Sequence, residues 1–257
     1  MTYAESFLRS HITSKADMMI LEKSPEKAHE LAQKDLGTVY GRPEDCLKNA
    51  DLIILAVKPQ DAPALFQHLK PMIDPQQVFL SIMAGVKIST IASGLGVRKI
   101  IRAMPNLPAQ IGMGMTAFTS SDDVTRIELV MVQNLLNTTG KTVYVEEESA
   151  IDAATAISGS GPAYVWYFMN AMMQAAQEMG FKQSEAELLV SQTFRGAIEL
   201  YNKSSFSCEE WIDKVCSKGG TTEAALRSYR NNEVHADIVT GAFAALRRAE
   251  ELGQSKA

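Results

Sequence analysis

The residues best suited to chemistry lie near the carboxyl end, at residues 217–226, which read Ser-Lys-Gly-Gly-Thr-Thr-Glu-Ala-Ala-Leu. Glu223 and the residues after it are expected to form the first turn of a helix, whose N–H groups lack intrahelical partners. Because two glycines precede that turn, a small carboxylate or phosphate would reach those donors. Thr221 and Thr222 add hydroxyls that donate or accept a hydrogen bond. The alternative interpretation is an ordinary Gly-Gly turn with a threonine N-cap.

Composition limits the partners of such a site. The 257 residues are 46% hydrophobic and 21% charged, and the net charge of −5 argues against nucleic acid or an acidic membrane surface. No apolar run approaches the roughly 18 residues of a membrane span, and the first residues have no signal-peptide pattern. Three cysteines are too few for a disulfide framework, so we expect a cytoplasmic protein. The histidines lack metal-ligand spacing, so no metal site is expected; they are His11, His29, His68 and His235.

The first half of the chain alternates apolar strands with helical stretches. The clearest strand, residues 51–57, is a continuous apolar run of the kind that a sheet covered on both faces requires. This rhythm predicts an α/β fold with a right-handed parallel sheet over residues 1–148. Further strands are expected at 18–21, 78–82, 99–104, 113–119 and 141–145, and helices at 5–11, 25–31, 87–94 and near 123–136, with another beginning at 61–63.

After three glutamates at residues 146–148, which we interpret as a solvated linker, the strand signals end. Residues 149–257 are predicted to form an all-helical dimerisation and substrate domain, with helices near 163–179, 184–201, 222–230 and 234–252. This region is rich in methionine and aromatic residues, among them Trp166 and Tyr167. Such a composition favours an apolar face that another subunit covers.

Four segments of small and polar residues carry a family resemblance. Residues 56–59 (Ala-Val-Lys-Pro) and 102–109 (Arg-Ala-Met-Pro-Asn-Leu-Pro-Ala) each leave a predicted strand, where α/β sheets bind nucleotides. Residues 158–164 (Ser-Gly-Ser-Gly-Pro-Ala-Tyr) enter a predicted helix, and the loop at 217–222 is the fourth segment. Together and in this order they closely resemble pyrroline-5-carboxylate reductases, the last enzymes of proline biosynthesis, over essentially the whole chain.

The resemblance implies an NAD(P)H-dependent oxidoreductase that transfers a hydride to the C=N carbon of 1-pyrroline-5-carboxylate and forms L-proline. It also implies a Rossmann-like dinucleotide-binding domain at residues 1–148. The helical domain that follows would form a homodimer by interlocking helices, and often a ring of dimers. Lys23 and Ser24 suit the 2′-phosphate of NADPH, whereas Glu22 suits the free hydroxyl of NADH, and we favour NADPH. The residues implied at the cofactor are Lys23, Ser24, Ala56, Val57, Lys58, Pro59, Ala84 and Gly85, and those at the substrate are Ser217, Gly219, Gly220, Thr221 and Thr222.

The implied reaction demands little of acidic or basic side chains. A protonated imine accepts a hydride readily, so the protein mainly orients the nicotinamide against it. Thr222 is the one catalytic residue that the resemblance implies, through a hydrogen bond to the ring nitrogen of the substrate. The helix expected at residues 163–179 has no lysine, whereas the connecting helix of the related hydroxyacid dehydrogenases carries a catalytic lysine. This difference favours an imine substrate.

Two departures from the family pattern bear on function. Lys218 stands where the family usually has proline; it would either attract the substrate carboxylate or point to solvent, and we favour solvent. The family begins with a strand and a Gly-x-Gly-Asn-Met turn that holds the pyrophosphate, and residues 1–5 align after that turn. We therefore expect a sheet without its first, central strand, and weak cofactor binding. The alternative function is a non-catalytic helical oligomer of the same family that has lost dinucleotide binding.

Overall fold

The computed structural model describes residues 1–254 and divides them into two compact units. The first contains residues 1–160 and the end of the chain from residue 245, and the second contains residues 161–244. All described strands belong to the first unit, and the second is built from helices. This confirms the predicted class, an α/β region followed by a helical region. The domain boundary after residue 148 stays a prediction.

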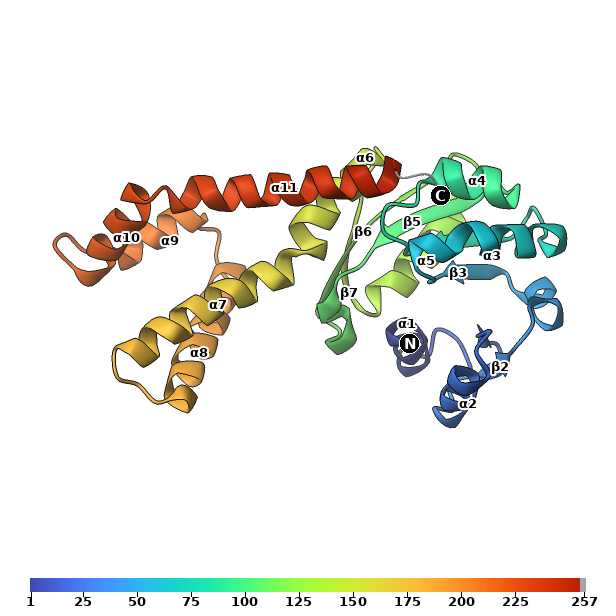
Figure 1. Ribbon diagram of the computed structural model, residues 1–257, viewed down its shortest axis with the longest axis horizontal. Helices are drawn as coiled ribbons and strands as arrows, with labels where there is room; N and C mark the ends of the chain where they lie inside the picture. The colour runs from blue at the N-terminus through green and yellow to red at the C-terminus, as the bar shows by residue number, and fades with distance from the viewer. Residues whose placement is uncertain (255–257) are drawn as a thin grey trace. The chain divides into compact units, whose positions relative to one another are not determined.

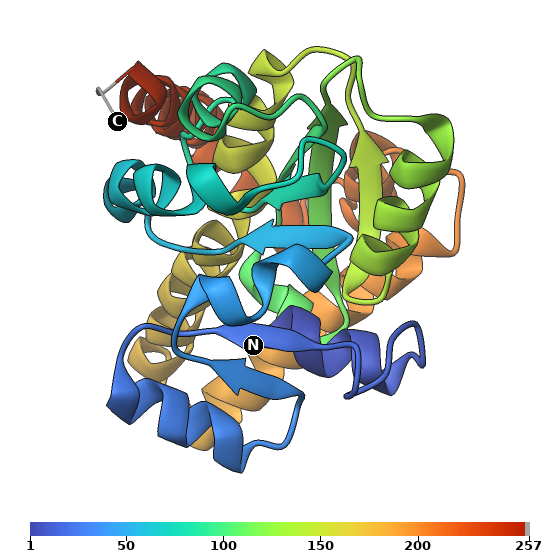
Figure 2. The same ribbon diagram turned by 90° about the vertical axis from the view of Figure 1, so that its right-hand side faces the viewer.

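The strands of the first unit form two separate sheets (Figure 1, Figure 2). The larger has the order β3-β4-β5-β6-β7, in which every pair is parallel except the antiparallel pair of β5 and β6. The smaller is the parallel pair of β1 and β2, of which the sequence pattern did not predict β2. The strand bounds are β1 Met19–Leu21, β2 Thr38–Tyr40, β3 Leu52–Leu55, β4 Val78–Ser81, β5 Ile100–Met104, β6 Gly114–Ser120 and β7 Gly140–Tyr144.

Four strands have an open edge among residues 1–254: β1 and β2 in the smaller sheet, and β3 and β7 in the larger. β1 pairs only with β2 and β3 only with β4, so each presents a row of backbone groups without a strand partner. In β3, Leu52, Ile53 and Ile54 are only half-buried, whereas β4 and β5 are buried along their whole length. The strand that the sequence predicts to be covered on both faces is therefore less buried than its neighbours.

Helices cover both faces of the larger sheet. On one face Phe79 and Ile100 pack with α3 and α4, and on the other Leu80 and Ile101 pack with α1 and α5. This alternation follows from the two-residue period of a strand. The helices are α1 Thr2–Arg9, α2 Pro25–Gln33, α3 Ala62–Leu69, α4 Ile88–Leu95, α5 Arg126–Asn137 and α6 Ser149–Ala154, which continues into a π-helical turn at Thr155–Gly159. Short 3₁₀ turns occur at Pro43–Asp45, Leu47–Asn49, Pro59–Asp61, Lys70–Met72 and Leu107–Ile111.

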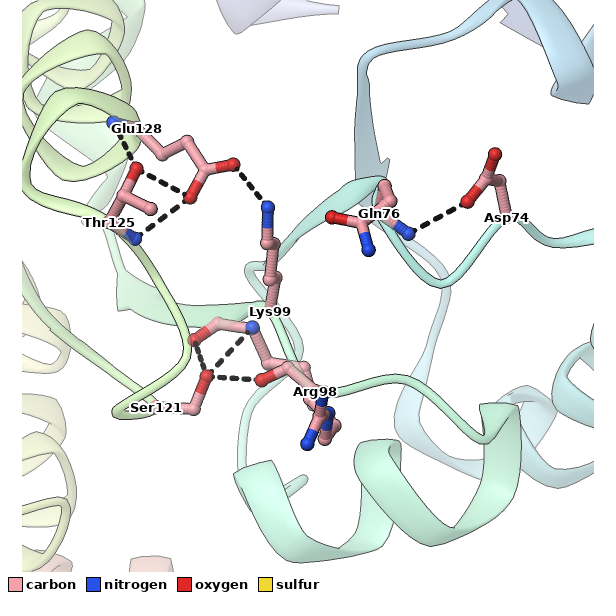
Figure 3. A network of polar contacts seen from close by, with 8 residues as sticks. Asp74, Gln76, Arg98, Lys99, Ser121, Thr125 and Glu128 are labelled. Carbon is pink, nitrogen blue, oxygen red and sulfur yellow. Dashed lines mark hydrogen bonds and ion pairs between the residues drawn. The ribbon is translucent and has the colours of Figure 1, made fainter.

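A polar network joins the amino end of β5 to the start of α5 (Figure 3). Thr125 and Glu128 form a capping box, in which each side chain accepts the backbone N–H of the other residue. Lys99 Nζ donates to the Glu128 carboxylate at 2.8 Å, and Ser121 Oγ accepts the Ile100 N–H at 3.0 Å. Because this network lies at the amino end of the strand, it supports the fold at the edge opposite to the one where such sheets bind ligands.

The second unit buries very little of its own surface. Ala186 and Val190 are the only buried residues within 161–244. The sequence predicted these helices except α9, which Ser207 begins through a capping box with Glu210. The helices are α7 Gly161–Glu178, α8 Gln183–Asn202, α9 Cys208–Val215, α10 Thr221–Asn231 and α11 Val234–Gln254, and the last part of α11 belongs to the first unit.

Candidate functional site

The first group of predicted cofactor residues follows β3. The last residues of β3 and β4 lie opposite each other in the parallel register, so both strands end at one edge of the sheet, here called the carboxyl edge. Ala56, Lys58 and Pro59 are exposed at this edge, whereas Val57 packs partly against the core. Asp61 occupies the N-cap position of α3, where the sequence predicted the helix to begin, and its side chain makes no capping bond to any described residue.

The second group lies in the loop that follows β4 at the same edge. Gly85 has φ +74°, a left-handed conformation that glycine adopts without strain, and Ala84 beside it is half-buried. A Cβ atom at Gly85 would lie 3.1 Å from the carbonyl carbon of Leu252 and 3.2 Å from the nitrogen of Gly253. The last turn of α11 therefore covers one side of this loop. No sequence motif indicated this contact, because its two sides lie far apart in the chain.

The third group, Lys23 and Ser24, follows β1 at the start of α2. Ser24 is the N-cap of α2, and its hydroxyl oxygen accepts the Lys27 N–H at 3.4 Å. Glu22 accepts the Ser24 N–H at 2.9 Å, and the Ser24 hydroxyl donates to Glu26, which lowers the pKa of that carboxyl. The turn combines an exposed lysine and a helix N-terminus with two carboxylates. Its geometry alone favours neither a phosphate nor a hydroxyl.

Asn106 connects two of the motifs that carry the family resemblance. Its Nδ2 donates to the Ser158 carbonyl at 3.0 Å, and its Oδ1 accepts the Met115 N–H at 2.9 Å. The segment after β5 is thereby joined to the π-helical turn that precedes α7 and to the start of β6. π-Helical turns interrupt the regular hydrogen-bond ladder and are frequent at functional sites.

The predicted substrate loop leads into α10, whose N-cap is Gly220, so the threonine N-cap of the alternative interpretation is wrong. The Gly219 N–H donates to the Glu223 carboxylate at 2.6 Å, and the Gly220 N–H donates to the Ser217 carbonyl at 2.9 Å. A Cβ atom at Gly220 would lie 2.7 Å from Ser217 Oγ and 3.0 Å from the Ser217 carbonyl oxygen, so a side chain here would require Ser217 to shift. Among the described residues no side chain caps α10, which leaves the N–H groups of its first turn available to a ligand.

The hydroxyls of this loop differ in exposure. Thr222 is half-buried, whereas Thr221 and Ser217 are exposed. Lys218 is exposed as well, which agrees with the side chain pointing to solvent. The loop belongs to the second unit and the three cofactor groups belong to the first.

A buried ion cluster at the carboxyl edge escaped the sequence analysis. Arg102 on β5 is 1% exposed, and its guanidinium contacts Glu148 at 3.0 Å and Asp152 at 2.7 Å. The interpretation of residues 146–148 as a solvated linker is therefore wrong for Glu148, because a buried arginine requires a counter-charge. The available signal was a single arginine inside the apolar run Ile-Ile-Arg-Ala-Met at residues 100–104.

Within residues 1–254, no helix has the length and apolar character needed to cross a membrane. In the same part of the chain, no set of three or more His, Cys, Asp or Glu side chains is arranged to hold a metal ion. The three cysteines are free thiols; they are Cys46, Cys208 and Cys216.

Two family models match the chain. Residues 148–252 match the model described as pyrroline-5-carboxylate reductase dimerisation. Residues 2–85 match the model described as NADP oxidoreductase, coenzyme F420-dependent. The first match covers most of the helical region, and the second covers α1 through the loop after β4.

Relatives match nearly the whole chain. The pyrroline-5-carboxylate reductase of Pseudomonas aeruginosa is 32% identical over 248 residues, which cover 96% of this chain and 91% of the relative. The pyrroline-5-carboxylate reductase 2 of Bacillus subtilis is 36% identical over 239 residues, which cover 90% of this chain and 84% of the relative.

Solved structures agree with these matches. The Coxiella burnetii pyrroline-5-carboxylate reductase superposes with a TM-score of 0.89 at 27% identity, covering 100% of this chain and 94% of the other. The Plasmodium falciparum pyrroline carboxylate reductase with NADP bound superposes with a TM-score of 0.87 at 26% identity, covering 98% of this chain and 93% of the other. A prephenate dehydrogenase from A. aeolicus, with a TM-score of 0.53 at 12% identity over 91% and 93% of the two chains, shares the fold alone.

Proposed function

The chain belongs to the pyrroline-5-carboxylate reductase family, and we propose that it reduces 1-pyrroline-5-carboxylate to L-proline by hydride transfer from NAD(P)H. This reaction is the last step of proline biosynthesis. The observation that carries the proposal is the match to the Pseudomonas aeruginosa reductase over 96% of the chain. The alternative, a non-catalytic oligomer without dinucleotide binding, is not favoured. An NADP oxidoreductase model matches residues 2–85, and a structural relative binds NADP.

The carboxyl edge supplies features that fit a dinucleotide. We assign Ala56, Val57, Lys58 and Pro59 to the adenosine and pyrophosphate side, because they follow β3 at the carboxyl edge, where such sheets bind nucleotides. Ala84 and Gly85 are assigned to the nicotinamide side, where the missing side chain of Gly85 permits close approach. The cofactor, when bound, supplies the hydride. The residues of the chain orient it and exclude water from one side of the loop.

The substrate loop is assigned to the carboxylate of 1-pyrroline-5-carboxylate. The N–H groups of the first turn of α10 would hold the carboxylate, supported by the helix dipole. Gly219 is already engaged by Glu223, so the donors proposed for the substrate are those of Thr221 and Thr222. The Thr222 hydroxyl is proposed to hydrogen-bond the ring nitrogen, which would orient the C=N bond toward the hydride donor. Ser217 and Gly220 shape the turn.

NADPH is the proposed cofactor, with NADH as the alternative. Support comes from Lys23 and from the N-terminus of α2 at Ser24, both suited to a 2′-phosphate. The test compares kcat/KM for NADPH and NADH in the natural chain and in Lys23→Gln. We expect the substitution to lower kcat/KM for NADPH about fivefold or more and to leave NADH unchanged, since one charge-assisted contact is lost. An equal effect on both cofactors would contradict the assignment of Lys23.

The chain carries a dimerisation domain of this family, and we propose a homodimer, with a ring of dimers as a further level of assembly. The support is the sparse core of the second unit, where Ala186 and Val190 are the only buried residues. The proposed compartment is the cytoplasm, which the three free thiols support.

The proposed reaction is tested directly with the purified 257-residue chain. NADPH oxidation is followed by absorbance in the presence and absence of 1-pyrroline-5-carboxylate, and proline is identified in the product by mass spectrometry. We expect that NADPH oxidation depends on the imine. We also expect proline to be formed in an amount equal to that of NADP. A dimer that binds neither NADPH nor the imine would instead support the non-catalytic alternative.

A further inference from the structure

The buried cluster of Arg102, Glu148 and Asp152 lies beside the loop that we assign to the cofactor. Arg102 is opposite Ser81 in the parallel register of β5 and β4, and the loop leaves the sheet directly after Ser81. One guanidinium faces two carboxylates, of which Asp152 is buried and Glu148 is partly accessible. Burial of this arginine is tolerable only because both partners are present.

Glu148 has a second contact beyond the arginine. Its Oε1, the same atom that accepts from Arg102 Nη1, also accepts the Ile88 N–H at 2.8 Å. Ile88 is the first residue of α4, and the side chain at its N-cap position, Lys87, makes no capping bond within the described chain. The helix therefore receives its cap from a carboxylate 60 residues further along.

The loop between β4 and α4 is thereby held at both ends. At its start the Met83 N–H donates to Ser81 Oγ at 3.3 Å, and at its end the Ile88 N–H donates to Glu148. Gly85 lies between these two anchors. The loop would lose its second anchor if the Glu148 carboxylate moved, and the ion pair with Arg102 holds that carboxylate in place.

We propose that Glu148 is a positioning residue, which Arg102 orients and which caps α4 so that the loop of Ala84 and Gly85 keeps the shape that receives the nicotinamide half of NADPH. The inference rests on the proposed function, because that function assigns the loop to the cofactor. A loop ordered before binding has less conformational entropy to lose when the ligand arrives. The expected signature is therefore in cofactor affinity, with the chemical step unchanged.

The test uses three variants of the 257-residue chain. Glu148→Ala removes both contacts, Glu148→Gln keeps an oxygen that accepts the Ile88 N–H, and Glu147→Ala changes an exposed neighbouring glutamate as the control. Steady-state kinetics measure KM for NADPH, KM for 1-pyrroline-5-carboxylate and kcat. Hydrogen–deuterium exchange without cofactor measures protection of the peptide that contains Ile88.

For Glu148→Ala we expect KM for NADPH to rise about fivefold to tenfold, with kcat and the substrate KM changed by less than about twofold. The Ile88 peptide should exchange faster in this variant. In Glu148→Gln, both KM for NADPH and the exchange of the Ile88 peptide should return to the values of the natural chain. Glu147→Ala should match the natural chain in both measurements. Rescue by glutamine separates loop positioning from a general loss of folding.

Unchanged exchange and unchanged KM for NADPH in Glu148→Ala would overturn the proposal, as would a Glu148→Gln variant as impaired as Glu148→Ala. If the natural chain does not reduce the imine at all, the proposed function fails. In that case, faster exchange of the Ile88 peptide in Glu148→Ala and its protection in Glu148→Gln would still show the capping contact. The assignment of the loop to NADPH would be overturned together with the function.

Discussion

At the residue scale, the loop proposed to bind the substrate offers a ligand backbone donors and few side chains. The Glu223 carboxylate accepts the Gly219 N–H and the backbone carbonyl of Ser217 accepts the Gly220 N–H, so both of these N–H groups are engaged within the turn. The first N–H groups of α10 and the Thr222 hydroxyl are what the loop offers a ligand. This division explains why an imine reductase functions without a dedicated acid or base, since a protonated imine needs orientation more than activation.

Substituting Thr222 by alanine tests its proposed hydrogen bond to the ring nitrogen. We expect kcat/KM for 1-pyrroline-5-carboxylate to fall about tenfold or more, because one such bond contributes roughly 1–3 kcal/mol. NADPH affinity should change little, and Thr222→Ser should keep most of the activity because it keeps the hydroxyl. Steady-state kinetics with each substrate varied in turn provide the measurement. Kinetics identical to those of the natural chain would remove Thr222 from the catalytic role.

A side chain at Gly220 should be more damaging than the loss of the Thr222 hydroxyl. In Gly220→Val the new Cβ would lie 2.7 Å from Ser217 Oγ and 3.0 Å from the Ser217 carbonyl oxygen, so the turn must shift. We expect kcat/KM to fall about a hundredfold or more, with the helical content by circular dichroism unchanged. Ala225→Val, one turn into the same helix, is the control for a β-branched residue in α10. Similar kinetics for both variants would argue against a requirement for glycine at residue 220.

At the scale of the elements, the edge of the sheet opposite to the ligand site is fastened by the capping box of α5 (Figure 3). Burial by itself raises the pKa of the Glu128 carboxyl, but the hydrogen bonds from Lys99 and Thr125 outweigh this effect. Together they hold the pKa below the ordinary value of 4.5. The two side chains of the ion pair are 19% and 21% exposed, so solvent screens it only partly. One carboxylate thus joins β5 to α5.

The sign of this shift sets the pH dependence of stability. A folded pKa below the unfolded one means that Glu128 stabilises the fold above pH 4.5 and that this contribution is lost as the pH falls through the folded pKa. We expect Glu128→Gln to lower the free energy of unfolding by about 1 kcal/mol at neutral pH. The difference from the natural chain should shrink in acid. Urea unfolding at several pH values measures it, with Glu30→Gln, an exposed glutamate, as the control. A difference that grows in acid would contradict this role.

At the scale of the whole molecule, the second unit has too small a core to be stable alone. Its helices leave many large apolar side chains exposed, although the sequence predicts that such faces are covered. The residues concerned on α7 and α8 are Val165, Trp166, Tyr167, Met172, Leu188, Leu189, Ile198, Leu200 and Tyr201. A second copy that covers this surface is consistent with the dimerisation model that matches residues 148–252.

We therefore expect the full chain to sediment as a dimer or a larger assembly at micromolar concentration. Tyr167 and Leu188 are 74% and 67% exposed, and replacing both by glutamate should shift the chain toward the monomer, because charges oppose burial. Gln192→Glu adds a charge to the same helix as Leu188 and should leave the assembly unchanged. Analytical ultracentrifugation decides between these outcomes. A folded natural monomer would refute the proposed interface.

Cofactor affinity is also a property of the whole sheet. β1 and β3 each have an open edge among the described residues, and a strand that paired with both would join the two sheets. We expect that adding an apolar strand and a Gly-x-Gly turn before Met1 strengthens NADPH binding about a hundredfold. Two charge-assisted N–H bonds to the pyrophosphate account for this, at roughly 1.5–3 kcal/mol each.

Isothermal calorimetry measures the difference in NADPH affinity between the extended chain and the 257-residue chain. The control is the same extension with valine in place of both glycines of the turn. That control should restore pairing of the strand, while the valine side chains hinder the approach of the pyrophosphate to the backbone N–H groups of the turn. Micromolar affinity of the 257-residue chain alone would contradict the expectation, since the phosphate contacts would then be made elsewhere.

The sequence by itself determined the elements whose hydrophobic pattern is local. The sequence predicted the strands β4 and β5, the start of α2 at its proline, and the long amphipathic helices after residue 160. Such predictions are possible because a strand or helix records its period in neighbouring residues. The Gly-Gly turn before α10 was predicted for the same reason. The strand β2 and the helix α9 were not predicted, although β1 and α4, which have the same lengths, were.

Tertiary structure alone decided which distant residues meet. Glu148 has the sequence context of a solvated linker, yet it caps α4 and pairs with Arg102, 46 residues away. The cover of Gly85 by the end of α11 and the bond from Asn106 to the Ser158 carbonyl are likewise contacts between distant segments. Charge and hydrogen-bonding capacity are visible in a sequence, but the partner that satisfies them is chosen by burial, which exists only once the chain has folded.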